Sequence, residues 1–169
     1  MTEIKPETIA NQSLVKAIIE QGLKAAQRQN WLEVSNQLQQ LPQSRSTNNS
    51  QQLLLNPRDW QTVFDIALEM LIKADFQHKW QITKLFPLLG QQIITPLNIL
   101  ALDETVEAEM RWFICQILGN FPEQSVVLTL VQILQQSNDN ELITIAGKTL
   151  IQIGDRAIDA LVDLLSQPK

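Results

Sequence analysis

Apolar residues recur at intervals of three and four along most of the chain, which is the spacing of one face of an α-helix. The pattern is clearest over Asn140–Leu165, where two such segments meet at Gly154. Glycine can adopt the left-handed backbone conformation that ends a helix, and Asp155 is expected to be the N-cap of the next one. The apolar positions of this helix pair are Leu142, Ile143, Ala146, Leu150, Ile151, Ile153, Ala157, Ile158, Leu161, Val162, Leu164 and Leu165.

The same spacing predicts further helices upstream, at about 8–28, 31–41, 57–74, 77–89, 93–101, 103–118 and 126–134. Their predicted inward residues include Leu14, Ala17, Ile18, Trp31, Val34, Leu38, Leu41, Trp60, Val63, Phe64, Leu68, Ile72, Trp80, Leu85, Leu88, Ile94, Leu97, Phe113, Ile114, Ile117, Val127 and Leu130. The sequence therefore predicts an all-α protein.

Proline and small polar residues mark where these helices start and stop. Asn56 followed by Pro57 is typical of an N-cap and a first helical residue. Pro87 is expected to shorten the helix that contains it, and Asp103 to cap the helix that follows it. The Ser-, Thr- and Asn-rich stretch Gln43–Gln52 favours local side-chain to backbone bonds and predicts an exposed loop.

The helix pairs indicate a repeat. Leu89-Gly90, Leu118-Gly119 and Ile153-Gly154 form similar corners, 29 and 35 residues apart. One helix pair cannot bury both of its faces, so stacked pairs complete a core. We expect a short α-solenoid of about four to five antiparallel pairs, with an irregular helix bundle as the alternative. The predicted division is a helical hairpin over 1–42, a linker over 43–56 and continuous repeats over 57–169.

Charge narrows the range of partners. The 169 residues carry a net charge of −5, and the asymmetry is large: residues 1–84 have nine basic and eight acidic groups, whereas residues 85–169 have four and ten. A clustered basic surface, which nucleic-acid binding requires, is missing from this sequence. No apolar run is long enough to predict membrane insertion. The one cysteine, Cys115, cannot form an intrachain disulfide, so we expect a reducing cytoplasm.

Few residues offer catalytic or metal chemistry. The only histidine, His78, has no cysteine or carboxylate at a metal-ligand spacing, and we interpret it as a surface or capping residue. Cys115 lies in an apolar run and is predicted to be a buried, inert thiol. No phosphate-binding glycine loop or hydrolase motif occurs. The sequence predicts no catalytic residue, no metal site and no cofactor, and hence a protein that is not an enzyme.

The C-terminal helix pair resembles a known repeat. Ala146, Leu150, Gly154, Asp155, Ala157, Ile158, Leu161, Leu164 and Leu165 are similar to the HEAT-like repeat of the phycobilisome lyase type. The similarity is best over 140–166, weaker over 105–136 and weakest over 60–102. It implies a HEAT-like scaffold, and a cyanobacterial source in particular. Relatives of this type include bilin lyase subunits, phycobilisome-degradation factors and scaffolds, and the repeat itself contributes no catalytic residue.

Two surface features are candidates for partner binding. Asp155, Asp159 and Asp163 are four residues apart, so Asp159 and Asp163 share one stripe of the last helix. The stripe is either a solvated polar face or an acidic ridge for a basic partner. Among the tryptophans, Trp80 and Trp112 lie near cations, Trp112 beside Arg111. Each tryptophan either packs in the core or is exposed as an interface anchor or as a surface on which a tetrapyrrole stacks.

These observations predict a non-catalytic scaffold or adapter that binds another protein, one with a basic surface, through a HEAT-like surface. The candidate binding residues are Asp159, Asp163, Trp80, Trp112 and Arg111. The alternative is a phycobilisome-related bilin lyase subunit, chaperone or degradation factor, with a phycobiliprotein as its partner. An exposed cysteine or tyrosine would favour that alternative, and the sequence has no tyrosine. A third hypothesis is that the chain is the N-terminal part of a longer protein.

Overall fold

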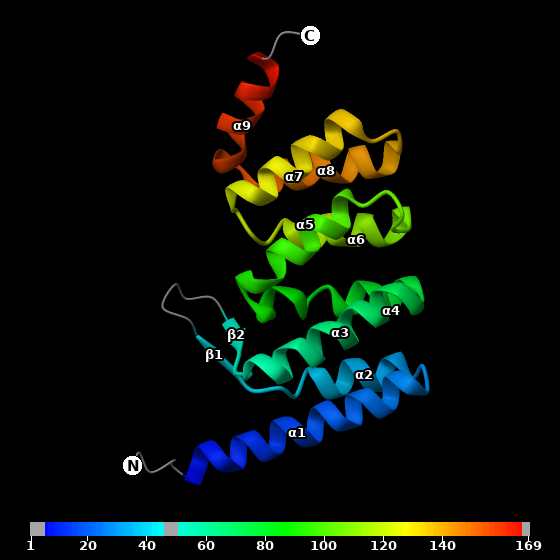
Figure 1. Ribbon diagram of the computed structural model, residues 1–169, viewed down its shortest axis with the longest axis vertical. Helices are drawn as coiled ribbons and strands as arrows, with labels where there is room; N and C mark the ends of the chain where they lie inside the picture. The colour runs from blue at the N-terminus through cyan, green and yellow to red at the C-terminus, as the bar shows by residue number, and fades with distance from the viewer. Residues whose placement is uncertain (1–5, 46–50, 167–169) are drawn as a thin grey trace. The chain divides into compact units, whose positions relative to one another are not determined.

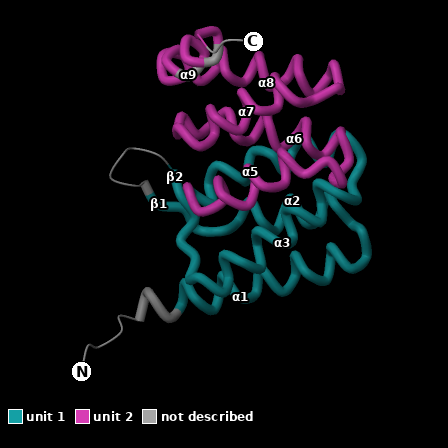
Figure 2. The backbone as a smooth tube through the Cα atoms, turned by 45° about the horizontal axis from the view of Figure 1, so that its top comes forward, with its two compact units in different colours: residues 1–90 teal, residues 91–169 magenta. Residues whose placement is uncertain are grey.

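A computed structural model describes residues 6–45 and 51–166, and within them the prediction of an all-α protein is confirmed. The described residues form nine α-helices, two short 3-10 helices and one two-stranded sheet (Figure 1). The chain divides into two compact units, residues 1–90 and 91–169 (Figure 2). The finer prediction of one continuous solenoid stays a prediction.

Unit 1 is built from two helix pairs and a small hairpin. Its core is formed where α1 packs on α2 and α3, and where α4 packs on α2 and α3. The bounds are α1 Pro6–Gln27, α2 Trp31–Leu38, β1 Gln43–Arg45, β2 Gln51–Leu53, α3 Pro57–Lys73, α4 Phe76–Ile82 and the 3-10 helix η1 Phe86–Leu89.

The stripe predicted for the first helix is correct at Ile18 and wrong at two other positions. Val15, Ile18 and Ile19 are buried, whereas Leu14 and Ala17 are exposed. The buried stripe keeps Ile18 and is rotated by about one residue from the predicted one, so that Val15 and Ile19 take the places of Leu14 and Ala17. In α2 the prediction is confirmed: its inward residues, and Leu41 after it, are all buried.

The segment 43–56, which the sequence predicts to be a loop, contains two short strands. β1 and β2 pair antiparallel, with Gln43 opposite Leu53. Leu53 is buried and β2 contacts η1, so one apolar side chain of the hairpin joins the core of unit 1. A single apolar residue gives no period-two pattern, which is why the strands were missed. The predicted loop's residues 46–50 lie outside the described residues.

Helix α3 begins where the sequence predicts, and its first two turns carry an aromatic cluster. The Asn56 side chain accepts a hydrogen bond from the backbone N–H of Asp59 at 2.9 Å, so Asn56 is the N-cap. Trp60 stacks on Phe64 and donates its indole N–H to the carbonyl of Leu89 at 2.8 Å. This bond ties the start of α3 to η1. Pro87 lies inside η1, and α4 has already ended at Ile82, before it.

In α3 and α4, two predicted core residues lie at the surface. Ile72 is 55% exposed on the last turn of α3, and Trp80 is 43% exposed on α4. In their place, Ile66 and Met70 of α3 and Lys79 of α4 are buried. Other residues predicted to face inward, Val63 and Phe64 among them, are buried as predicted, so the prediction is wrong only at the edge of each face.

Unit 2 consists of helices that pack in two rows. α5 packs on α7 and α7 on α9, whereas α6 packs on α8. Each row is joined to the other by the pairs α5–α6 and α7–α8. The bounds are the 3-10 helix η2 Gln91–Ile93, α5 Ile94–Leu102, α6 Ala108–Leu118, α7 Gln124–Gln136, α8 Asn140–Ile153 and α9 Asp155–Ser166.

The turn before α6 differs from the predicted cap. α6 begins at Ala108, so Asp103 lies too early to be its N-cap. Asp103 instead accepts bonds from the hydroxyl of Thr105 at 2.6 Å and from its backbone N–H at 2.9 Å. These bonds lower the pKa of Asp103 below its ordinary value. The carboxylate stabilises the connecting turn rather than a helix start.

The three glycine corners are of two kinds. Gly90 and Gly154 have φ of 80° and 74°, the left-handed region that glycine tolerates. Gly119 has φ of −59° and ψ of −14°, which any residue adopts. A Cβ on Gly119 would lie 3.0 Å from Cγ2 of Thr149 in α8. At this corner a glycine allows two helices to approach closely. The three corners look alike in the sequence, but glycine is needed for its backbone conformation at two of them and for its small size at the third.

The last helix, α9, buries fewer of its apolar side chains than the sequence predicts. Ala157 is buried, but Ile158, Val162 and Leu165 are exposed, and so is Ile151 at the end of α8. Leu165 is 85% exposed. No further helix of this unit covers that side within the described residues. Asp155 is the first residue of α9 rather than the residue before it, so its carboxylate lies in the first turn. The side chain of Leu164 lies outside the description.

Candidate protein-binding groove

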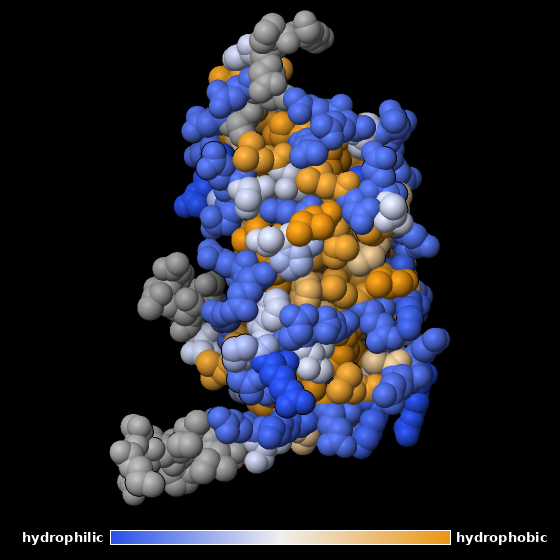
Figure 3. Space-filling model, viewed as in Figure 1, coloured by the Kyte–Doolittle hydropathy of each residue, from blue (hydrophilic) through white to orange (hydrophobic). Residues whose placement is uncertain are grey.

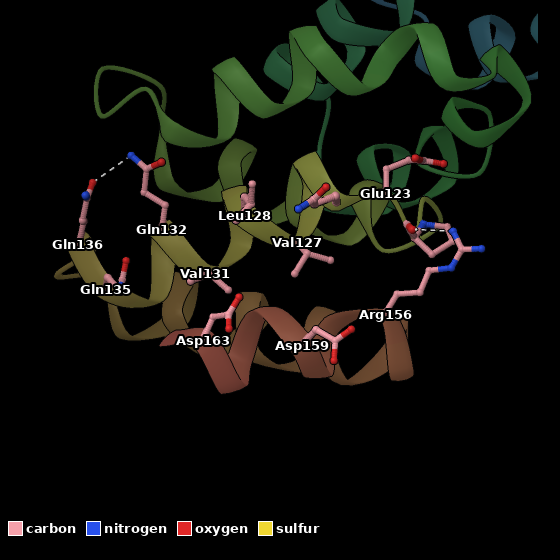
Figure 4. Close-up of a pocket in the computed structure, with 12 residues that line it drawn as sticks. Glu123, Val127, Leu128, Val131, Gln132, Gln135, Gln136, Arg156, Asp159 and Asp163 are labelled. Carbon is pink, nitrogen blue, oxygen red and sulfur yellow. Dashed lines mark hydrogen bonds between the residues drawn. The ribbon is translucent and has the colours of Figure 1, made fainter. Parts of the chain in front are cut away.

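A groove of ≈ 850 Å³ lies between α7 and α9 in unit 2. Figure 4 shows its side chains: those of α9 form one wall, and those of α7 form the floor and the other wall. It is lined by Pro122, Glu123, Gln124, Val127, Leu128, Val131, Gln132, Gln135, Gln136, Arg156, Asp159 and Asp163.

The groove opens beside the point where the start of α9 is held to the segment that precedes α7. Gly154 turns the chain after α8, and the guanidinium of Arg156 donates to the carbonyl of Pro122 at 3.0 Å. Ala157, the next residue, is buried. From this point the two helices diverge (Figure 1). The start of α9 therefore contacts the start of α7, and the space between the helices opens toward their C-terminal ends.

The floor of the groove is apolar. Val127 and Val131 are buried in α7 one turn apart, and their side chains point toward α9 in Figure 4. Leu128 lies at the rim and is 54% exposed. Figure 3 shows hydrophobic surface in this part of unit 2, bordered by hydrophilic side chains. Because Val127 and Val131 are already covered, the apolar surface that a ligand could remove from water in this groove belongs mainly to Leu128.

The walls of the groove are polar and acidic. Asp159 and Asp163 are exposed on α9 and lie opposite Val127 and Val131 (Figure 4). The α7 wall carries glutamines, and Gln132 donates to Gln136 at 3.1 Å. Of the charged residues in the lining, three are acidic, namely Glu123, Asp159 and Asp163, and one, Arg156, is basic. The lining has a net negative charge, and its cation bonds to a backbone carbonyl.

The structure brings together only part of the predicted binding set. Asp159 and Asp163 line one groove, whereas Arg111 and Trp112 belong to α6 and do not line it. Arg111 donates its Nε–H to the carbonyl of Ala101 at 2.8 Å and is half-buried. Trp112 is half-buried in an edge-to-face contact with Phe113. Trp80 lies at the surface of unit 1.

The residues that α7 contributes to the groove were not among the binding residues predicted from the sequence. Val126, Val127 and Leu128 are three consecutive apolar residues in one helix. Successive helical residues are 100° apart, so such a run extends beyond a single buried stripe. That run was the available signal for an apolar residue at the surface. The glutamines carried none, because glutamine is common on exposed faces throughout this chain.

The residues with potential for chemistry lie elsewhere. Cys115 is buried in α6, and burial raises the pKa of its thiol to about 12, while Arg111 opposes that shift. His78 bonds through Nδ1 to the carboxylate of Asp75 at 2.7 Å, and Asp75 is the N-cap of α4. In the part of the chain that the structure describes, no group of three or more His, Cys, Asp or Glu side chains could hold a metal ion.

No family model, curated protein or solved structure matches this chain. The resemblance to the HEAT-like repeat of the phycobilisome lyase type therefore stays a prediction. Among residues 6–45 and 51–166, no single helix has both the length and the apolar composition of a membrane span. A bent pair of segments, Phe76–Leu89 and Gln91–Leu102, passes by length and composition alone.

Proposed function

We propose that this protein is a non-catalytic binding module whose C-terminal unit takes a basic segment of another protein in the groove between α7 and α9. One observation carries the proposal: the groove places the exposed Leu128 together with an acidic wall formed by Asp159 and Asp163. Apolar contact supplies affinity, and the carboxylates select a cationic partner. The mechanism is complementarity of shape and charge, with no bond made or broken.

The net negative charge of unit 2 also favours a cationic partner. Residues 91–169 contain ten acidic and four basic side chains. Such a field raises the rate at which a cationic partner arrives, and salt weakens it. Exposed ion pairs contribute only about 0.2–1 kcal/mol each. We therefore expect the acidic wall to govern association rate and selectivity more than total affinity.

The test is affinity capture from lysate of the native cells, followed by binding measurements on the purified partner. Asp159→Lys combined with Asp163→Lys reverses the acidic wall. Asp65→Lys is the control, because it introduces the same kind of charge reversal at an exposed position of α3. Circular dichroism confirms that each variant retains its helices. An absorbance spectrum of the eluate reports any bound pigment.

The proposal requires one partner that the wild type and Asp65→Lys retain and the double variant loses. With the purified partner, the double variant should bind at least about tenfold more weakly, equivalent to about 1.4 kcal/mol. Binding should also weaken as the Debye length falls from about 30 to 8 Å between 0.01 and 0.15 M salt. Equal capture by all variants, or capture of none, refutes it. A visible bilin band that both variants retain would favour the pigment-handling alternative.

A further inference from the structure

We infer that the partner segment is an amphipathic α-helix with two basic residues one turn apart beside an apolar stripe. This inference rests on the proposed function and specifies the ligand of the same groove. It follows from the spacing of the acidic wall, the exposed leucine of α7 beside it and the lack of a strand edge along the groove.

The wall and the floor repeat with the same period. Asp159 and Asp163 are four residues apart on α9, and Val127 and Val131 are four residues apart on α7. Four residues of a helix rise about 6 Å. Figure 4 draws Asp159 beside Val127 and Asp163 beside Val131, but both valines are buried, so the spacing that a ligand meets is that of the two exposed carboxylates. A ligand that fits must repeat a cation once per turn, with an apolar group placed to reach the exposed Leu128.

An amphipathic helix presents that arrangement. Residues four apart lie on the same face, so an apolar row and a neighbouring basic row can run side by side along it. Lysine or arginine at i and i+4 would then lie opposite Asp159 and Asp163, while the apolar row packs on the exposed Leu128. The glutamines of α7 provide uncharged donors and acceptors for the polar flank of the ligand.

An extended peptide could also place cations about 6 to 7 Å apart, at i and i+2. It would, however, need partners for its backbone N–H and C=O groups. Both sides of the groove are helices, and the only sheet in the described residues lies in unit 1. The groove thus lacks the strand edge along which extended peptides bind, whereas a helix satisfies its own backbone groups.

The experiment uses three synthetic peptides of equal length, composition and charge. The matched peptide is an alanine-rich helix with leucines at i and i+4 beside lysines at i and i+4. The scrambled peptide has the same residues without the two rows. The third peptide keeps the matched order but moves one proline from its end to its centre, which breaks the helix. Fluorescence anisotropy measures their binding to the wild type, the double aspartate variant and Asp65→Lys.

We expect the matched peptide to bind the wild type and Asp65→Lys with a Kd below about 1 mM. The scrambled and proline-centred peptides should bind at least tenfold more weakly. The double aspartate variant should lose the matched peptide and gain a peptide in which glutamates replace the two lysines. That exchange of charges identifies Asp159 and Asp163 as the opposing groups, because general loss of structure cannot produce it.

Equal binding by the proline-centred peptide, or no binding of the matched peptide up to about 1 mM, overturns the helical ligand. The proposed function would still stand if the protein captured from lysate depends on Asp159 and Asp163. Binding of every peptide without regard to the aspartates overturns both. The two failures are therefore distinguishable.

Discussion

Replacing Gly119 with alanine should destabilise unit 2, although the backbone there accepts any residue. With φ of −59° and ψ of −14°, an alanine has no backbone strain at this position. In the absence of crowding, Gly→Ala at such a site stabilises a protein by about 0.4–1 kcal/mol, because it restricts the unfolded chain. The sign of the effect therefore depends on what the new methyl group contacts.

The new Cβ would be crowded by three neighbours. It would lie 3.0 Å from Cγ2 of Thr149, 3.2 Å from Nε2 of Gln152 and 3.3 Å from the backbone oxygen of Gln116. Carbon atoms pack best about 3.5–4.0 Å apart. Gln152 is exposed and can move, but Thr149 is buried and its branched side chain has few rotamers. Overpacking of this kind costs about 1–3 kcal/mol, so we expect a net loss of about 1–2 kcal/mol.

Urea unfolding followed by circular dichroism measures this loss. Gly147→Ala is the matched control, because it lies within α8 and its Cβ would be 3.9 Å from the nearest side-chain atom, an ordinary contact. That variant should be stabilised by about 0.5–1 kcal/mol. Thr149→Ser removes the crowding methyl group, so the double variant with Gly119→Ala should lose less than the two single effects combined. If Gly119→Ala is as stabilising as Gly147→Ala, the close approach of α6 and α8 is wrong.

Three further predictions follow from buried and capping groups. Cys115 should not react with a thiol reagent at pH 8 in the native protein and should react fully in urea, because its thiol is buried with a pKa of about 12. Rapid labelling of the native protein would show that the Cys115 face of α6 is accessible to solvent. Asn56→Ala should lower the free energy of unfolding by about 1 kcal/mol, and Asn56→Ser, which can still cap α3, should lose less; equal losses would contradict the capping role. Hydrogen bonds from the backbone and ring of His78 lower the pKa of Asp75 below its ordinary value of 3.8. The ionised Asp75 carboxylate therefore stabilises the fold fully above pH 3.8, and this stabilisation is lost as the pH falls through the lowered pKa. The stability difference between the wild type and Asp75→Asn should shrink accordingly in acid, and a difference that grows would refute the sign.

The fold was predictable where local signals and packing agree. Asn56 followed by Pro57 starts a helix by local chemistry alone, and the structure confirms it. The core face of α6 was also correct, since Phe113, Ile114 and Ile117 are all buried. Prediction failed where tertiary contacts decide. The strands over 43–45 and 51–53 depend on one buried leucine and on pairing with each other, which no local period reveals.

The candidate site was predictable only in part. The four-residue spacing placed Asp159 and Asp163 on one face of a helix, and both line the groove. Periodicity does not give the direction in which a helix leaves its predecessor. The groove arises because Arg156 attaches α9 to the carbonyl of Pro122 and the two helices then diverge. The bond joins residues 34 positions apart, so the sequence pattern of α9 could not indicate it.

The same features that open the groove leave its acidic wall weakly held. Three apolar residues of α9, Ile158, Val162 and Leu165, are exposed, so this helix gains less from burial than its neighbours do. Segments with few buried apolar contacts unfold locally at the lowest free energy. A ligand that contacts both α7 and α9 must therefore spend part of its binding energy on holding α9 in place. Binding should in turn stabilise α9 against local unfolding, in proportion to ligand occupancy. A helical ligand suits this arrangement, because it is itself ordered by the same contacts and because its charge, rather than a large buried area, selects the site.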